Sequence, residues 1–168
     1  MSLTTKISAH INARLIGTSD HGEPKDELSN LYNKEMATGT GSGLADKVFS
    51  DQRTLAASAT ESLDLAGGSL FDSLGAALTF VKVKAILIKA AVGNINDVLV
   101  GGAASNAFAG PFADASDIIG IKPGGVLLVA APVAGWTVTA GTGDLLKIAN
   151  SAGTTGVTYD ITIIGTSA

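Results

Sequence analysis

Residues 123–143 read PGGVLLVAAPVAGWTVTAGTG, a run of 21 residues without a charged side chain. The run is long enough for a membrane span, but prolines and glycines interrupt it, and continuous apolar character over about 18 residues is missing. Its pattern is instead that of two short β-strands, 125–132 and 136–141, around a turn. We therefore predict two central strands of a β-sheet, with Trp136 buried between sheets, and no contact with a membrane.

The first strand of the chain is predicted by an almost perfect alternation of apolar and polar residues over 5–16. A period of two residues indicates a strand with one buried face. A polar loop is predicted over 17–27, and the residues after it, 28–38, are ambiguous between a short helix and an irregular arm. The apolar residues of the alternating stretch are Ile7, Ala9, Ile11, Ala13 and Leu15.

A glycine-rich segment, TGTGSG at 38–43, is typical of a flexible joint. We place a boundary there. Residues 1–43 are predicted to form a strand-forming N-terminal arm or hairpin with its hinge, and residues 44–168 a compact core domain.

The core domain reads as a succession of short strands separated by glycine and proline turns. Eight or more such strands at a spacing of roughly 8–12 residues indicate an antiparallel all-β sandwich or barrel. The strongest strand is predicted within 78–91, where Lys82, Lys84 and Lys89 are interpreted as guards of an exposed sheet edge. In the last strand, the residues that share one face are Val157, Tyr159, Ile161 and Ile163.

Composition narrows the classes of function. Charged residues make up 15% of the chain, against about 25% in an average domain, so apolar surface is expected to be covered by association. The net charge of −4 gives no basic footprint for nucleic acid. The chain has no cysteine, which excludes disulfides and thiolate sites. The N-terminus has no apolar core typical of a signal peptide, so we expect synthesis and folding in the cytoplasm.

Reactive side chains are scarce, and we expect no catalytic site, cofactor or metal. The only histidines, His10 and His21, lie in the predicted arm, where a histidine-based general base is difficult to build. The glycine-rich joint has no lysine of a phosphate-binding loop. Two loop phenylalanines, Phe108 and Phe112, are candidates for contact with a neighbouring subunit, or for covering one end of the core.

Four segments of the chain carry a resemblance to a known group of proteins: FSDQRTLAASATESLDLAG, GGVLLVAAP, GWTVTAGTGDLLKIAN and TYDITIIG. Together they resemble small virion proteins of tailed bacteriophages that are encoded near the major capsid protein and act as capsid decoration or cement proteins. The resemblance covers roughly residues 44–165. It implies a jelly-roll-like fold, a homo-oligomer (trimer or dimer), the major capsid protein as partner, and a place on the capsid exterior of the virion.

The function expected from the sequence is thus a non-enzymatic virion protein that stabilises the capsid shell. The predicted arm is suited to pair with the sheet edge of another subunit by β-augmentation. Seven residues are predicted to contact a partner. In the arm they are Ile7, Ala9, Ile11, Ala13 and Leu15, and in the core domain they are Phe108 and Phe112. Two alternatives stay open: a phage tail, baseplate or fibre-attachment component, and a carbohydrate-binding adhesion module, against which the 5% content of aromatic residues argues.

Overall fold

The computed structural model describes residues 2–168, and this part of the chain is built from β-strands and connecting loops, without a helix. An all-β fold with antiparallel sheets, as predicted, is confirmed. Within these residues, no helix capable of crossing a membrane is found. The strands are β1 (Thr5–Ile16), β2 (Lys25–Met36), β3 (Lys47–Leu55), β4 (Thr60–Asp64), β5 (Leu70–Phe71), β6 (Ala77–Leu78), β7 (Lys82–Ala90), β8 (Val98–Gly101), β9 (Ile118–Ile121), β10 (Val126–Ala130), β11 (Trp136–Thr137), β12 (Leu145–Asn150) and β13 (Val157–Thr166).

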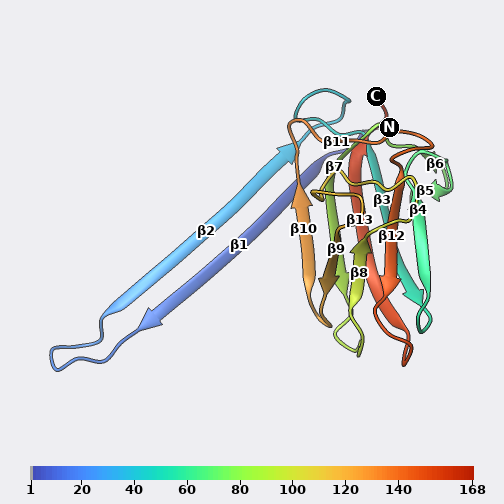
Figure 1. Cartoon of the computed structure of the whole chain (residues 1–168). Coiled ribbons are helices and arrows are strands. Elements are labelled where there is room, and N and C mark those ends of the chain that lie inside the picture. The colour runs from blue at the N-terminus through green and yellow to red at the C-terminus, as the bar shows by residue number, and fades with distance from the viewer. Residues whose placement is uncertain (1) are drawn as a thin grey trace.

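Two antiparallel sheets form a sandwich (Figure 1). One sheet has the order β10-β7-β13-β3, with the short β11 also paired to β7, and the other has the order β4-β12-β8-β9. The pairs are nested along the chain: β3 pairs with β13, β4 with β12, β7 with β10, and β8 with β9. The first four strands of this set thus pair, in reverse order, with the last four. The β7–β13 and β8–β12 contacts then join the pairs into two sheets.

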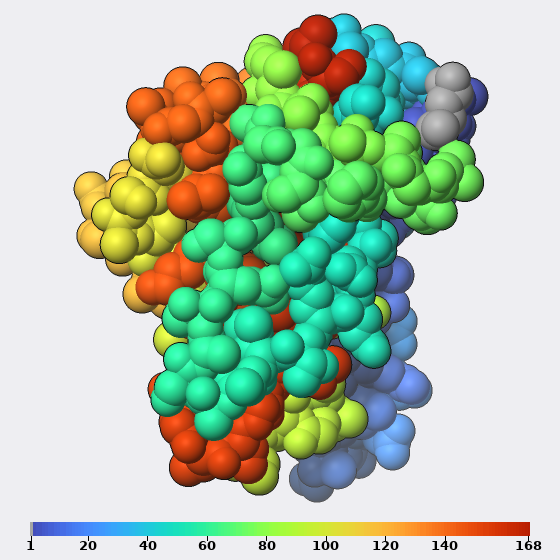
Figure 2. Space-filling view, turned by 90° about the vertical axis from the view of Figure 1, so that its right-hand side faces the viewer, coloured from blue at the N-terminus to red at the C-terminus, as the bar shows by residue number. Residues whose placement is uncertain are grey.

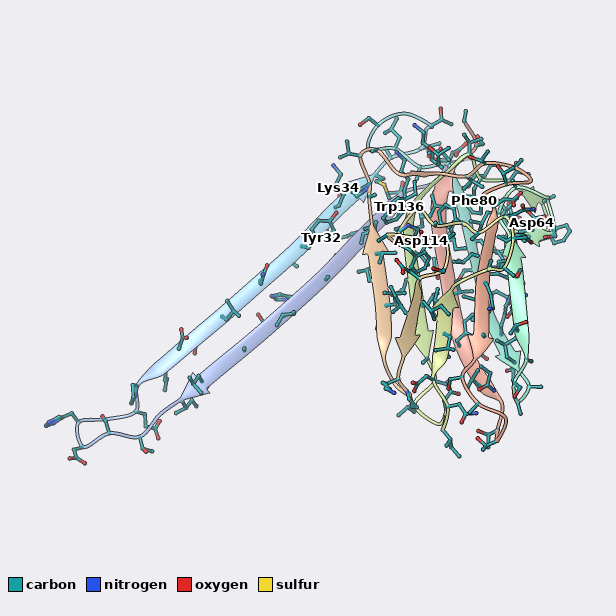
Figure 3. All side chains as sticks on the ribbon, in the orientation of Figure 1. Tyr32, Lys34, Asp64, Phe80, Asp114 and Trp136 are labelled. Atoms are coloured by element: carbon teal, nitrogen blue, oxygen red, sulfur yellow. The ribbon has the colours of Figure 1, made fainter. Side chains whose placement is uncertain are left out.

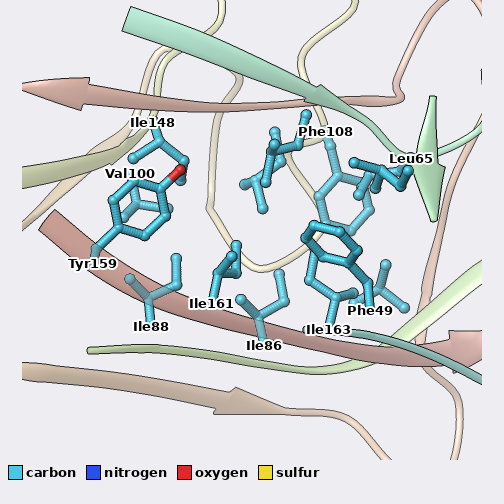
Figure 4. Packing of buried hydrophobic residues seen from close by; sticks show 14 of the residues in the cluster. Phe49, Leu65, Ile86, Ile88, Val100, Phe108, Ile148, Tyr159, Ile161 and Ile163 are labelled. Carbon is cyan, nitrogen blue, oxygen red and sulfur yellow. The ribbon is translucent and has the colours of Figure 1, made fainter. Parts of the chain in front are cut away.

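The core lies between the two sheets and consists of aliphatic side chains with a few aromatic rings (Figure 4). The predicted inward face of the last strand is confirmed, because Val157, Tyr159, Ile161 and Ile163 are all 0% exposed. Burial of each large apolar side chain contributes about 1.5–3 kcal/mol. β13 lies between β7 and β3, and its inner residues therefore pack at the centre of the molecule.

The uncharged run of 123–143 forms two strands around a turn, β10 and β11, as predicted. The prediction that both strands are central is wrong. β10 lies at the edge of its sheet, and β11 has only two residues, both paired with β7. The turn between them, closed by a hydrogen bond from Gly135 N to Ala131 O (2.8 Å), returns the chain to the same neighbouring strand. Trp136 consequently packs half-buried against the rim of the core instead of between the sheets.

The lysines of β7 do not guard a sheet edge, because β7 lies between β10 and β13. The register with β13 shifts between Ile164 and Gly165, which leaves Lys84 as the extra residue of a β-bulge. The Lys84 side chain is buried, and its Nζ donates a hydrogen bond to the Val133 carbonyl at 2.8 Å. Burial, and secondarily Lys82, lower the pKa of Lys84. Its role is to hold the β10–β11 turn.

The N-terminal strands β1 and β2 form a separate two-stranded sheet that extends away from the sandwich (Figure 1). Their register runs from Thr5 opposite Met36, at the root, to Ile16 opposite Lys25, at the tip. The helix or irregular arm considered for 28–38 is wrong for most of that stretch, because β2 extends through Met36. Pairing along the full length of β1 decides the conformation of these residues, which carry little strand pattern of their own.

Candidate assembly surface

The hairpin has two chemically different faces, because residues directly opposite each other on paired strands project to the same side. The alternating apolar side chains of β1 lie on one side, the apolar face. The residues between them lie on the opposite side, the polar face, and are polar or charged except for Leu31 and Ile16. Following the register, the apolar face consists of the pairs Ile7 and Lys34, Ala9 and Tyr32, Ile11 and Asn30, Ala13 and Leu28, and Leu15 and Asp26.

At the root, the apolar face is fixed to the sandwich. Ile7 is only 5% exposed and belongs to a small cluster with Met36, Ala45 and Ala85, against which Leu128 and Ile164 of the outer sheet surface also pack. A contact of Ile7 with a partner, predicted from the sequence, is therefore wrong: its side chain is covered by its own chain. Beside it lies a hollow of about 220 Å³, lined by Lys6, Ile7, Ser8, Ala85, Leu87, Leu128, Thr162 and Ile164.

Beyond the root, the apolar face is uncovered. Ile11 is 67% exposed, Leu15 72%, Leu28 56% and Tyr32 44%. Figure 3 shows the side chains along the hairpin, with Tyr32 and Lys34 labelled near the root. The predicted buried face of the first strand is thus wrong for most of its length, because the hairpin leaves the sandwich after its first residues. Ala9, Ile11, Ala13 and Leu15 stay candidates for contact with a partner.

The polar face satisfies much of its own bonding potential across the two strands. Lys6 pairs with Glu35 (Nζ to Oε1, 3.5 Å) and Arg14 with Glu27 (Nε to Oε1, 3.3 Å). His10 Nε2 and Ser29 Oγ are hydrogen-bonded at 3.0 Å. These contacts stiffen the hairpin from one side only. A two-stranded ribbon with one open apolar face is marginally stable in water by itself, so covering the apolar face would stabilise the hairpin.

Of the two loop phenylalanines, Phe108 lies in the core and Phe112 packs against it, so only Phe112 stays a candidate for contact with a neighbouring subunit. Phe108 is 2% exposed and lies in the core, where its backbone N donates a hydrogen bond to Leu145 O at 3.0 Å. Its predicted contact with a partner is wrong, because the loop folds inward and the ring helps to fill the sandwich. Phe112 is half-buried and packs against the same core. Both rings thus cover the core, the alternative considered for them.

A polar cluster closes the side of the sandwich between β3 and β4, the side that faces the viewer in Figure 2. Arg53 Nη1 pairs with Glu61 Oε2 at 2.7 Å, and the Arg53 guanidinium lies 5.7 Å from the ring centroid of Phe49. The Tyr159 hydroxyl donates a hydrogen bond to the same carboxylate. Burial, followed by the hydrogen bond to Glu61, raises the pKa of Tyr159 far above its usual value. The phenol stays protonated and joins the two sheets.

A second polar cluster joins two loops of the sandwich. Near the β12–β13 turn, Asn96 Nδ2 donates to Asn150 Oδ1 at 3.0 Å and to Thr155 O at 2.9 Å, which ties two loops together. Across residues 2–168, no group of three or more histidine, aspartate and glutamate side chains is placed to hold a metal ion. The alternation of β1 identified the apolar residues that share one face of this strand, but the sequence predicted that face to be buried. The contribution of Leu28 and Tyr32 from β2 was not predicted.

Comparisons with protein-family models, with curated proteins and with solved structures found no match to this chain.

Proposed function

We propose that this chain is a structural protein of a tailed-phage virion that decorates the capsid exterior and stabilises the shell, and that its sandwich is a jelly roll. The nested pairing of β3 with β13, β4 with β12, β7 with β10 and β8 with β9 supports the jelly-roll assignment. A jelly roll is an eight-strand double sheet that occurs in viral capsid and lectin domains. The sequence resemblance of residues 44–165 to phage decoration proteins is in keeping with it.

The observation that carries the proposal is the contrast between a closed sandwich and an open hairpin. The sandwich buries its inward side chains, whereas Ile11 and Leu15 of the hairpin are 67% and 72% exposed. Apolar patches that stay exposed in a folded chain are typical of surfaces for association. A rigid body with a projecting, half-apolar ribbon suits a protein that binds assembled neighbours better than one that encloses a small substrate.

The mechanism of stabilisation follows from mass action. A protein that binds only the assembled shell lowers the free energy of that state by RT ln(1 + [L]/Kd), where [L] is its free concentration. Many copies bound to one particle add their contributions. The partners in this proposal are the major capsid protein and further copies of the chain.

The test is reconstitution with capsids of the phage that encodes the chain. Purified capsids lacking the protein are mixed with the wild-type chain or with Ile11→Asp, and co-sedimentation and the temperature of capsid disruption are measured. We expect the wild-type chain to bind in a copy number that matches the capsomers and to raise the disruption temperature. We expect Ile11→Asp to bind more weakly. Absence from virions, or unchanged heat stability of saturated capsids, would contradict the proposal.

A further inference from the structure

Two charged side chains on the apolar face of the hairpin have no ion-pair partner within residues 2–168. They are Lys34, near the root, and Asp26, at the tip, both on β2. Eight residues of extended strand separate them by about 26 Å, since each residue advances the chain by about 3.3 Å. The two charges therefore cannot meet within one hairpin.

The order of residues along this face is symmetric about its centre. On β1 the side chains run large, small, large, small, large from root to tip. On β2 they run positive, large, polar, large, negative. A rotation by 180° about an axis that crosses both strands at Ile11 and Asn30 places Ala9 against Ala13, Tyr32 against Leu28, and Lys34 against Asp26 of the second copy. Ile7, which its own sandwich covers, takes no part in this contact.

We propose that two copies of this chain pack the apolar faces of their hairpins against each other, tip to root, around this two-fold axis. Ile11 then lies against Ile11 of the second copy, Tyr32 against Leu28, and Lys34 against Asp26. Both cross-copy ion pairs form at the ends of the contact. Such a contact is isologous, because the same patch serves both copies.

The root of the hairpin offers a place for the tip of the second copy. Leu15, 72% exposed, has no cover in its own chain. In the tip-to-root arrangement it comes to the hollow of about 220 Å³ beside Ile7, whose lining includes Leu87 and Leu128. An exposed leucine thereby gains an apolar environment that is already partly built.

The other face-to-face arrangement of the same ribbons, root to root around an axis parallel to the strands, places β1 on β2. It sets Lys34 against Ile7 and Asp26 against Leu15. Each charge then loses water without gaining a partner, which is unfavourable. The charges thus select the tip-to-root orientation.

The contact is small. Two strands over about 26 Å bury less than a standard interface of about 800 Å² per partner. We therefore expect a monomer–dimer equilibrium that depends on protein concentration, to which further contacts in an assembly add. The inference deepens the proposed function by naming a second copy as the occupant of the hairpin face, but it does not depend on a capsid.

Charge reversal tests the arrangement in purified protein by sedimentation velocity. Lys34→Asp and Asp26→Lys are each expected to weaken dimerisation at least tenfold, because like charges then meet at both ends. An equimolar mixture of the two variants is expected to dimerise again, since a hairpin that is acidic at both ends then faces one that is basic at both ends. Lys25→Asp, on the polar face beside Asp26, is the matched control and is expected to dimerise like the wild type.

Single cysteines test the position of the axis, since the chain has no cysteine. Sheets packed face to face lie about 10 Å apart, too far for a disulfide but within reach of a short bis-maleimide. Ile11→Cys is expected to give cross-linked dimers, whereas Asn12→Cys, on the polar face, is expected to give few. A wild-type chain that stays monomeric at the highest soluble concentration, trimers instead of dimers, equal cross-linking of both variants, or no rescue in the mixture would overturn the inference.

These outcomes are separable from those for the proposed function. A monomer that binds and stabilises capsids would overturn the dimer alone. A dimer that does not bind capsids would overturn the decoration role and leave the dimer intact.

Discussion

The last strand of the sandwich and the first strand of the hairpin are built on the same alternating pattern, yet their apolar side chains have opposite environments. Ile161 and Ile163 of β13 are 0% exposed, whereas Ile11 and Leu15 of β1 are 67% and 72% exposed. β13 has a paired strand on both sides and a second sheet over its inner face. β1 has one neighbour and no cover beyond its root. The same alternation of apolar and polar residues thus lies over a buried core in β13 and over an exposed surface in β1.

The largest difference is expected when the same truncation is made in both regions. Ile161→Ala removes a fully buried side chain and is expected to lower the free energy of unfolding by about 2–5 kcal/mol. Ile11→Ala is expected to change that of the monomer by less than about 0.5 kcal/mol. Chemical denaturation of dilute protein measures both. Similar losses for the two variants would show that the hairpin face is already buried in the monomer.

The next effect concerns the polar cluster that joins the two sheets. Tyr159→Phe removes the hydrogen bond to the half-buried Glu61 carboxylate, and we expect it to cost about 1–3 kcal/mol of stability. The matched control is Tyr32→Phe, at a half-exposed tyrosine of the hairpin, for which we expect little change in dilute solution.

The same tyrosine predicts a dependence on pH. The pKa of Tyr159 is raised in the folded chain, so its contribution is fully present below the unfolded value of about 10 and is lost as pH rises above that value. The stability of the wild-type chain is therefore expected to fall above pH 10 more steeply than that of Tyr159→Phe. Equal slopes in denaturation series across this range would contradict the assignment.

A charge placed on the apolar face of the hairpin is expected to affect self-association without affecting the stability of the sandwich. Ile11→Asp is expected to leave the stability of the dilute monomer within about 0.5 kcal/mol, because the substituted side chain stays in water. Its self-association is expected to weaken at least tenfold, about 1.4 kcal/mol, because two carboxylates meet at the axis. Asn12→Asp is the control, because Asn12 follows Ile11 on β1 but lies on the polar face, and this variant is expected to associate like the wild type. Unfolding of the sandwich by Ile11→Asp would contradict the separation.

The smallest effect is expected from the ion pairs of the polar face. Lys6 and Glu35 are largely exposed, and such pairs contribute about 0.2–1 kcal/mol. Glu35→Ala, which breaks this pair without touching the hollow beside Ile7, is therefore expected to leave both stability and association close to the wild-type values. A tenfold loss of association in sedimentation would instead place the polar face in the contact.

The sequence predicted the positions of several strands better than it predicted which of their faces are covered by other parts of the chain. Alternation identified β1 and β13 and the residues that share a face on each. It could not distinguish the buried face of β13 from the open face of β1. An alternation with a period of two residues shows which side chains share a face, but it does not show whether another element covers that face. β2 was missed because KDELSNLYNKEM is mostly polar, and its strand conformation depends on pairing with β1.

Three further departures have the same origin in long-range pairing. Trp136 lies at the rim because β11 returns to the neighbour that β10 already has. Lys84 is buried because a bulge, invisible in the sequence, turns it toward the β10–β11 turn. Phe108 fills the core because its loop folds inward. Of the candidate contact surface, the exposed residues of β1 were recognisable from sequence, whereas Leu28, Tyr32 and the charges at Lys34 and Asp26 required the register of the hairpin.

Amide hydrogen exchange of the purified chain at low and high concentration tests the central claim, that the apolar face of the hairpin is the association surface. Association is predicted to slow exchange in β1 and β2, most strongly around Ile11 and Asn30, with sandwich strands such as β13 unchanged. Slowing confined to the sandwich, or hairpin exchange that is independent of concentration while the protein demonstrably associates, would contradict it.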